Sequence, residues 1–159
     1  MDFENQLEQA ISRGRQKNAR RVDSEKQKAL SQEDIKNRHT SFRLDLSDYI
    51  EHGLKKLAGH FPGFEYETIY GSKGWGGAVY RDDLTTSGGK AGSYFSRVEI
   101  TVKPLNEFNV VNISGKGTIK NKEMFGWNHF KEIAEAGEED FREKIDAWIL
   151  QYAEQFAAA

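Results

Sequence analysis

The feature that most constrains the fold is a strict alternation of side chains between Ser93 and Lys103. A period of two is typical of a β-strand with one buried face. Pro104 has no N–H to donate to a ladder, so we expect this strand to end there and a second strand, Phe108–Ile113, to pair with it antiparallel. The side of the alternation that we expect to be buried consists of Tyr94, Ser96, Val98, Ile100 and Val102.

Shorter stretches are expected to complete the sheet. Phe64–Tyr70 alternates aromatic and acidic residues and predicts the first strand, and Ala78–Arg81 predicts a short second strand after a glycine-rich turn. Asp82–Gly92 has the composition of a surface loop. Gly115–Ile119 either extends the preceding strand through a bulge or forms a short fifth strand. The sequence therefore predicts four or five antiparallel strands.

Helical spacing of apolar residues occurs on both sides of these strands. We expect a core helix from Ser31 to about Ala58, with Ser31 as its N-cap and Leu30 packed as a hydrophobic staple. A short helix is expected around Trp127–Ala134, and a final helix after Gly137. We expect the final helix to lie across the sheet with one apolar face, formed by Phe141, Ile145, Trp148, Ile149, Tyr152 and Phe156.

The first thirty residues have a composition that favours helix but carry a thin apolar stripe, namely Phe3, Leu7 and Ile11, followed only by Val22 and Leu30. Such a thin stripe buries too little surface to offset the entropy of ordering. We therefore expect a charged helical or mobile arm over residues 1–30 and a single domain over residues 31–159. The predicted class is α+β, with long N-terminal helices, a four- to five-stranded antiparallel sheet and a C-terminal amphipathic helix packed on the sheet.

Opposite charges gather near the two ends of the chain. Between Ser12 and Lys28 seven basic and two acidic residues give a net charge of +5, and between Glu132 and Glu154 two basic and eight acidic residues give −6. These ends could attract one another within a chain or between chains. The residues that could bind an anionic polymer are Arg13, Arg15, Lys17, Arg20 and Arg21.

Three interpretations of the arm remain open: a solvated arm, a surface for self-association or for a protein partner, and a nucleic-acid surface. Nucleic acid is not favoured, because Asp23 and Glu25 interrupt the basic patch. No aromatic residue lies between its arginines to stack on bases.

Several classes of protein are excluded or disfavoured. The chain has no cysteine, which excludes disulfides and thiolate zinc sites. We find no apolar run near the roughly 20 residues of a membrane span and no secretory signal pattern, so we expect a cytoplasmic protein without membrane contact. The four histidines show no metal-ligand spacing, and the glycine-rich segment Ser87–Ser93 lacks the Ser or Thr of a phosphate-binding loop. We therefore expect no metal and no cofactor.

Aromatic and arginine residues gather in the predicted sheet region. Core packing under the last helix explains most of them, and the remainder would line a ligand or peptide site on the sheet or its loops. The candidate residues for this site are Tyr70, Trp75, Tyr80, Arg81, Tyr94 and Arg97.

We favour a non-catalytic cytoplasmic binding or adaptor module that acts through the arm and the sheet. No arrangement of nucleophile, base and acid in the sequence indicates catalysis. Two alternatives remain open. One is a nucleic-acid-associated protein that uses the basic arm, and the other is a small-ligand binder or enzyme with a pocket between the sheet and the last helix.

Overall fold

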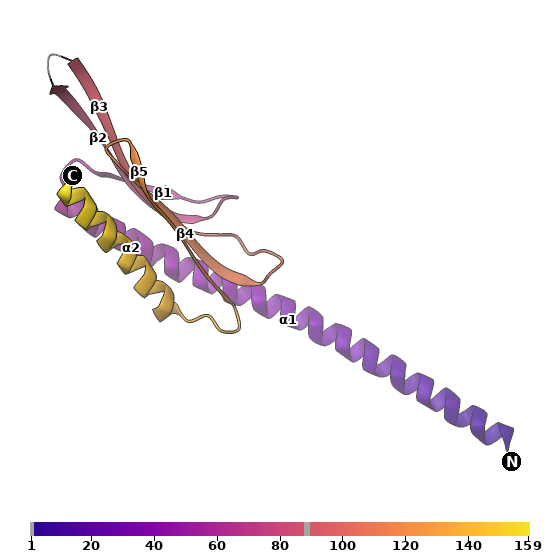
Figure 1. Cartoon of the computed structure of the whole chain (residues 1–159). Helices are drawn as coiled ribbons and strands as arrows, with labels where there is room; N and C mark the ends of the chain where they lie inside the picture. Colours follow the sequence, from indigo (N-terminus) through magenta and orange to yellow (C-terminus); the bar gives the residue numbers. More distant parts are fainter. Residues whose placement is uncertain (1, 88–89) are drawn as a thin grey trace. The chain divides into compact units, whose positions relative to one another are not determined.

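The computed structural model describes residues 2–87 and 90–159, and their side chains except those of residues 27–30 and 85–91. The strands form one sheet in sequence order, each antiparallel to the next. The α+β class, with a long N-terminal helix, an antiparallel sheet and a C-terminal helix packed on it, is confirmed (Figure 1). The elements are α1 (Phe3–His60), β1 (Glu65–Ile69), β2 (Trp75–Ser87), β3 (Lys90–Val102), β4 (Val110–Ile119), β5 (Lys122–Glu132) and α2 (Glu138–Ala158).

The chain divides into two compact units, Met1–Asn37 and Arg38–Ala159. Helix α1 passes through this boundary without a break, so the helix start that we predicted at Ser31 was wrong. The residues around Ser31 are mostly Glu, Gln, Lys and Ala, which propagate a helix readily, so no new cap is needed. The predicted staple residue Leu30 lies outside the described side chains. The limit of the arm at residue 30 stays a prediction.

The register gives the sheet two different faces. Val79 pairs with Val98, and Val98 pairs with Gly117, so these positions share the face that is turned toward the helices. The predicted buried side is confirmed from Ser96 to Val102, and Thr101 on the other face is buried as well. Tyr94 differs and is 41% exposed, because at its level β3 pairs with β2 but not with β4. The fully buried residues of this face include Val79, Val98, Ile100, Val102, Val111 and Ile113.

Within the second unit, α2 and residues 38–60 of α1 run parallel to each other over the same face of the sheet (Figure 1). The predicted apolar face of α2 is confirmed, since all six of its residues are buried. Gly53 allows the two helices to approach closely, because a Cβ at this position would lie 2.6 Å from Cδ1 of Ile149. The buried apolar residues that α1 contributes are Leu46, Ile50, Leu54 and Leu57.

The prediction of a loop over Asp82–Gly92 was wrong, because Asp82–Ser87 and Lys90–Gly92 belong to β2 and β3 and pair as one hairpin. Gly88 and Gly89 lie outside the described residues. In this part of the hairpin β2 has no pairing with β1, and β3 has none with β4. A two-stranded ribbon that neither β1 nor β4 extends needs no apolar alternation, which explains its loop-like composition.

The prediction of a short helix around Trp127–Ala134 was also wrong, because most of this segment belongs to β5. Phe125, Trp127 and His129 pair with helix-facing positions of β4 and are half-buried. Phe130 points to the other face and is 58% exposed. The spacing of three between Trp127 and Phe130 therefore did not mark a helical face.

β4 continues to Ile119, and its register against β5 shifts between Gly117 and Thr118. Of the two alternatives that we expected for Gly115–Ile119, the extension of the preceding strand through an irregularity is therefore the correct one. Lys120 and Asn121 have φ values of 47° and 71° and form the tight turn into β5. The Asn121 side chain accepts a hydrogen bond from the Phe95 N–H at 2.8 Å and donates one to the Ser93 carbonyl at 2.9 Å. The Asn121 side chain therefore provides hydrogen-bond partners for backbone groups of β3 just beyond the last residue that pairs with β4.

Candidate functional site

The face of the sheet away from the helices carries a hollow of about 300 Å³, which we call the lysine hollow. Its walls come from β1, β3, β4 and the adjoining turns. The register explains how residues distant in sequence meet here, because Glu99 pairs with Lys116 and Thr101 pairs with Ser114. The lining residues are Ile69, Lys73, Glu99, Thr101, Lys103, Ser114, Gly115 and Lys116.

Small side chains on this part of the sheet leave the hollow unfilled. Gly76 lies opposite Thr101 and Ala78 opposite Glu99 on the same face. Both small residues are buried on the face of the sheet opposite to Val79 and Val98. Arg97 is one of these neighbours, with Nη1 at 2.6 Å from Glu67 Oε1 and Nη2 at 3.7 Å from Glu99 Oε2.

The charge of the lysine hollow is unbalanced. Among the described side chains, Lys73, Lys103 and Lys116 have no carboxylate within ion-pair distance. The acid in the lining is Glu99, which is shared with Arg97 at 3.7 Å. The hollow therefore presents a surplus of two positive charges together with the hydroxyl groups of Thr101 and Ser114.

The six residues that we predicted as a ligand site are not brought together. Tyr80 and Arg97 pair with each other on the open face. Trp75 and Arg81 occupy positions of the helix-facing register, because they pair with Val102 and Ser96. The two remaining residues are exposed elsewhere, Tyr70 by 79% after β1 and Tyr94 by 41% in the hairpin.

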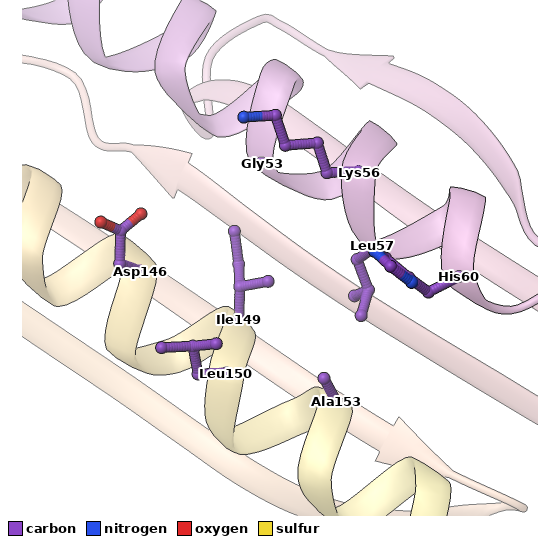
Figure 2. Close-up of a pocket in the computed structure, with 8 residues that line it drawn as sticks. All are labelled: Gly53, Lys56, Leu57, His60, Asp146, Ile149, Leu150 and Ala153. Atoms are coloured by element: carbon purple, nitrogen blue, oxygen red, sulfur yellow. The ribbon is translucent and has the colours of Figure 1, made fainter.

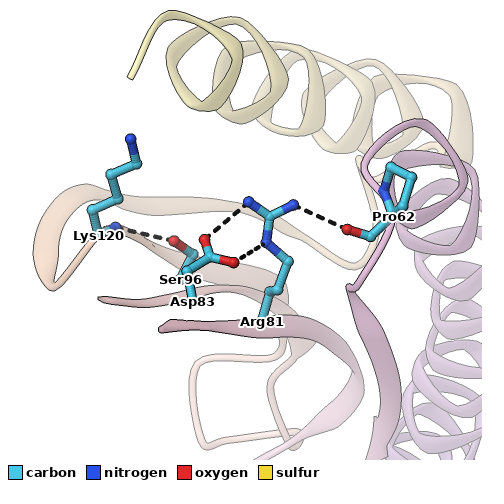
Figure 3. Close-up of polar contacts among 5 residues, drawn as sticks. All are labelled: Pro62, Arg81, Asp83, Ser96 and Lys120. Carbon is cyan, nitrogen blue, oxygen red and sulfur yellow. Dashed lines mark hydrogen bonds and ion pairs between the residues drawn. The ribbon is translucent and has the colours of Figure 1, made fainter. Parts of the chain in front are cut away.

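Arg81 is engaged in structural contacts, as Figure 3 shows. Its guanidinium donates to the Pro62 carbonyl at 3.0 Å and lies 2.9 Å from each carboxylate oxygen of Asp83. The same group lies 5.3 Å from the Phe64 ring and 4.9 Å from the Phe156 ring. Arg81 therefore ties β2 to the segment after α1 and to the end of α2, and each of its three guanidinium nitrogens already has a protein partner.

Trp75 and Tyr80 are also held by neighbours. The Arg43 guanidinium lies 3.5 Å from the Trp75 ring centroid, so this indole face is covered by α1. A hydrogen bond to Glu65 is the main cause that raises the pKa of Tyr80 above its ordinary value. The role of these residues in ligand binding stays a prediction.

A second hollow, of about 310 Å³, is an apolar groove between α1 and α2 (Figure 2). Leu150 is 67% exposed at its edge. Asp146 at the rim already accepts the hydroxyl hydrogen bond of Tyr49, at 2.7 and 2.9 Å to its two oxygens. The groove is lined by Gly53, Lys56, Leu57, His60, Asp146, Ile149, Leu150 and Ala153.

Between α2 and β5, where we had considered a ligand pocket, aromatic rings stack. The rings of Trp127 and Trp148 are 5.5 Å apart and nearly parallel, at 3°. Phe125 stacks on Trp127 at 4.9 Å, and the Trp127 Nε1 donates to Gln151 at 3.2 Å. The Tyr152 hydroxyl donates to the Thr118 carbonyl at 2.8 Å, and burial raises the pKa of this tyrosine.

The five predicted anion-binding residues, Arg13, Arg15, Lys17, Arg20 and Arg21, are exposed along the N-terminal part of α1. At about 100° per residue, Arg13, Lys17 and Arg20 lie on one side of the helix and Arg15 on the opposite side. Arg21 donates to the Asn18 side chain at 3.0 Å. The five residues therefore form no single flat surface.

Among the side chains that the structure describes, no group of three or more His, Asp or Glu could hold a metal ion. Within the described residues, neither helix is long and apolar enough to cross a membrane. Residues distant in sequence form the lysine hollow, and the sequence carried no signal for it, because the pairing of β3 with β4 and the turn between β1 and β2 bring Lys73, Lys103 and Lys116 together.

No protein-family model, curated protein or solved structure matches this chain.

Proposed function

We propose that the chain is a non-catalytic binding module that holds an anionic group of its ligand in the lysine hollow. The observation that carries the proposal is the set of three ammonium groups, of Lys73, Lys103 and Lys116, around one hollow with no carboxylate at ion-pair distance in the described structure. A bound anion would balance this surplus of positive charge.

The chemistry of the lining indicates the class of ligand. Three lysines supply ammonium donors for a phosphate or carboxylate group. The hydroxyls of Thr101 and Ser114 can donate to the same group, while Glu99 can accept from a hydroxyl or amine of the ligand. A volume of about 300 Å³ is at the small end of ligand sites, which favours a small anion or the anionic end of a larger ligand.

Titrations followed by NMR test this function. Inorganic pyrophosphate and citrate serve as probes, so that phosphate and carboxylate chemistry are compared. We expect amide shifts at Lys73, Thr101, Lys103, Ser114 and Lys116 with at least one probe.

Changing any of the three lysines to Gln should weaken binding about two- to fivefold, which corresponds to 0.5–1 kcal/mol for an exposed charge contact. The control is Lys56→Gln, which removes the same charge on the helix side of the domain. The proposal fails if neither probe shifts these amides, or if Lys56→Gln weakens binding as much as the changes in the hollow.

We propose a cytoplasmic location for this module. A chain without cysteine forms no disulfide and needs no oxidising compartment. Fractionation of cells that express the tagged chain would test the location, and recovery in an extracytoplasmic fraction would contradict it.

A further inference from the structure

The N-terminal unit carries an exposed apolar stripe along α1. Phe3, Leu7, Ile11 and Val22 are exposed by 75%, 45%, 47% and 39%. At about 100° per residue, these residues share a sector of roughly 100° with Gly14 and Asn18, and Arg21 and Glu4 lie at its two edges. An apolar helix face of this kind is stabilised when a second helix covers it.

The spacing of the residues in the stripe is the same in both directions along the helix. Its members are residues 3, 7, 11, 14, 18 and 22, with spacings of four, four, three, four and four. A second copy turned end over end about the point between Ser12 and Arg13 therefore repeats the stripe at the same levels. Phe3 then lies level with Val22 of the other copy, Leu7 with Asn18, and Ile11 with Gly14. The small Gly14 leaves room for Ile11 at the centre of such a pair.

The charges favour the same arrangement. In an antiparallel pair, Glu8 of each copy lies on the flank that carries Arg15 of the other copy, which gives two equivalent pairs of opposite charge. A parallel pair would instead place the basic segment from Arg13 to Arg21 beside the same segment of the other copy, where like charges repel. We propose that two copies of this chain pair through residues 3–22 as an antiparallel two-stranded coiled coil. This proposal is independent of the lysine hollow.

Sedimentation of the full chain over a range of concentrations tests the proposal. We expect a concentration-dependent dimer that is weakened about three- to tenfold by Glu8→Lys and by Arg15→Glu, because each change turns two attractive pairs into repulsive ones. The double variant Glu8→Lys/Arg15→Glu exchanges the two charges and should restore the wild-type affinity. Residues 8 and 15 are seven apart on one helix, so an effect on helix stability alone would not be reversed in this way.

Arg13→Glu is the matched control. It changes the net charge as much as Arg15→Glu does but lies on the side of α1 away from the stripe. This variant should dimerise like the wild type. A chain that stays monomeric at all concentrations, or a dimer that Arg13→Glu weakens as much as Arg15→Glu does, would overturn the proposal.

Cross-linking determines the orientation, because the chain has no cysteine of its own. A mixture of Leu7→Cys and Asn18→Cys chains in a glutathione buffer should form a mixed disulfide. Leu7→Cys alone should not cross-link, since residue 7 of the two copies would lie about 16 Å apart in the antiparallel pair. Cross-linking of Leu7→Cys with itself, without the mixed product, would show a parallel pair and overturn the proposal.

Discussion

The imidazole Nε2 of His129 lies 2.7 Å from the carboxylate Oδ2 of Asp140, which joins β5 to the first turn of α2. Lys131 Nζ lies 3.2 Å from the same oxygen. The hydrogen bond with His129 is the main cause that lowers the pKa of Asp140 below its ordinary value of 3.8. The contact with Lys131 also lowers this pKa. This carboxylate therefore fixes the start of the helix whose apolar face covers the sheet.

The lowered pKa of Asp140 makes its contribution dependent on pH. A carboxyl group whose pKa is lower in the folded state stabilises the fold above its unfolded pKa, and this stabilisation is lost as the pH falls through the folded pKa. Asp140→Asn should therefore lower the urea midpoint at pH 7, and the difference from the wild type should shrink below pH 3.8. Glu143→Gln, on the exposed side of α2, is the control. An Asn variant with equal loss at pH 7 and pH 2.5 would contradict the linkage.

Trp148 is 5% exposed and stacks on Trp127. Trp148→Ala should cost about 3–5 kcal/mol, because a large aromatic side chain leaves a cavity between α2 and β5. Urea unfolding measures the change. Leu150→Ala, on the same helix but at a 67% exposed position, should change stability by less than about 0.5 kcal/mol. Equal midpoints for Trp148→Ala and the wild type would mean that this contact is not formed.

Gly117 makes room for two aromatic rings on the helix-facing side of β4. A Cβ at this position would lie 2.9 Å from Cδ2 of Phe125 and 3.0 Å from Cδ2 of Tyr152. Gly117→Ala should therefore cost about 1–3 kcal/mol through overpacking. Gly126→Ala is the matched strand control, because nothing lies within 4 Å of its added Cβ. If thermal unfolding showed the same stability for both variants, the tight packing at Gly117 would be refuted.

The sequence predicted those elements that bury one face. The run from Ser96 to Val102 and the apolar face of α2 were found correctly, because burial on one side imposes a period of two or of 3.6. β5 was missed because Trp127 and Phe130 imitate helical spacing, although Phe130 is exposed on the opposite face. The ribbon part of β2 and β3 was missed because neither β1 nor β4 pairs with it there and its sequence carries no apolar alternation.

The candidate site was harder to predict than the fold. Lys73, Lys103 and Lys116 are separated by thirty and thirteen positions in the sequence. Their proximity follows from the pairing of Glu99 with Lys116 and from the turn that precedes β2. Conversely, Tyr80 and Arg81 are adjacent in sequence, yet the alternation of the strand sends them to opposite faces. The composition of the chain alone could not show which of these residues lie together and which lie on opposite faces.

The N-terminal arm should be dispensable for the stability of the domain. Among the described side chains, the buried ones begin at His39. Removing residues 1–29 should therefore change the melting temperature of the domain by less than about 3 °C. The melting temperature should be measured at low protein concentration, where dimerisation contributes least. A drop of 10 °C or more at that concentration would mean that the arm supports the domain.

The basic residues of the arm should bind duplex DNA weakly at most. Asp23 and Glu25 follow the patch in the sequence, and Arg15 lies on the side of the helix opposite Arg13, Lys17 and Arg20. Four phosphate contacts would give a log–log salt slope of roughly −3.6, so any binding seen at 50 mM salt should be lost at 200 mM. Fluorescence anisotropy with a labelled oligonucleotide measures both the affinity and the slope. A different result would favour a nucleic-acid-associated protein. This result is tight binding at 200 mM salt that is abolished by Arg13→Glu and unchanged by Arg15→Glu. The contacts with DNA would then lie on the side of α1 away from the apolar stripe.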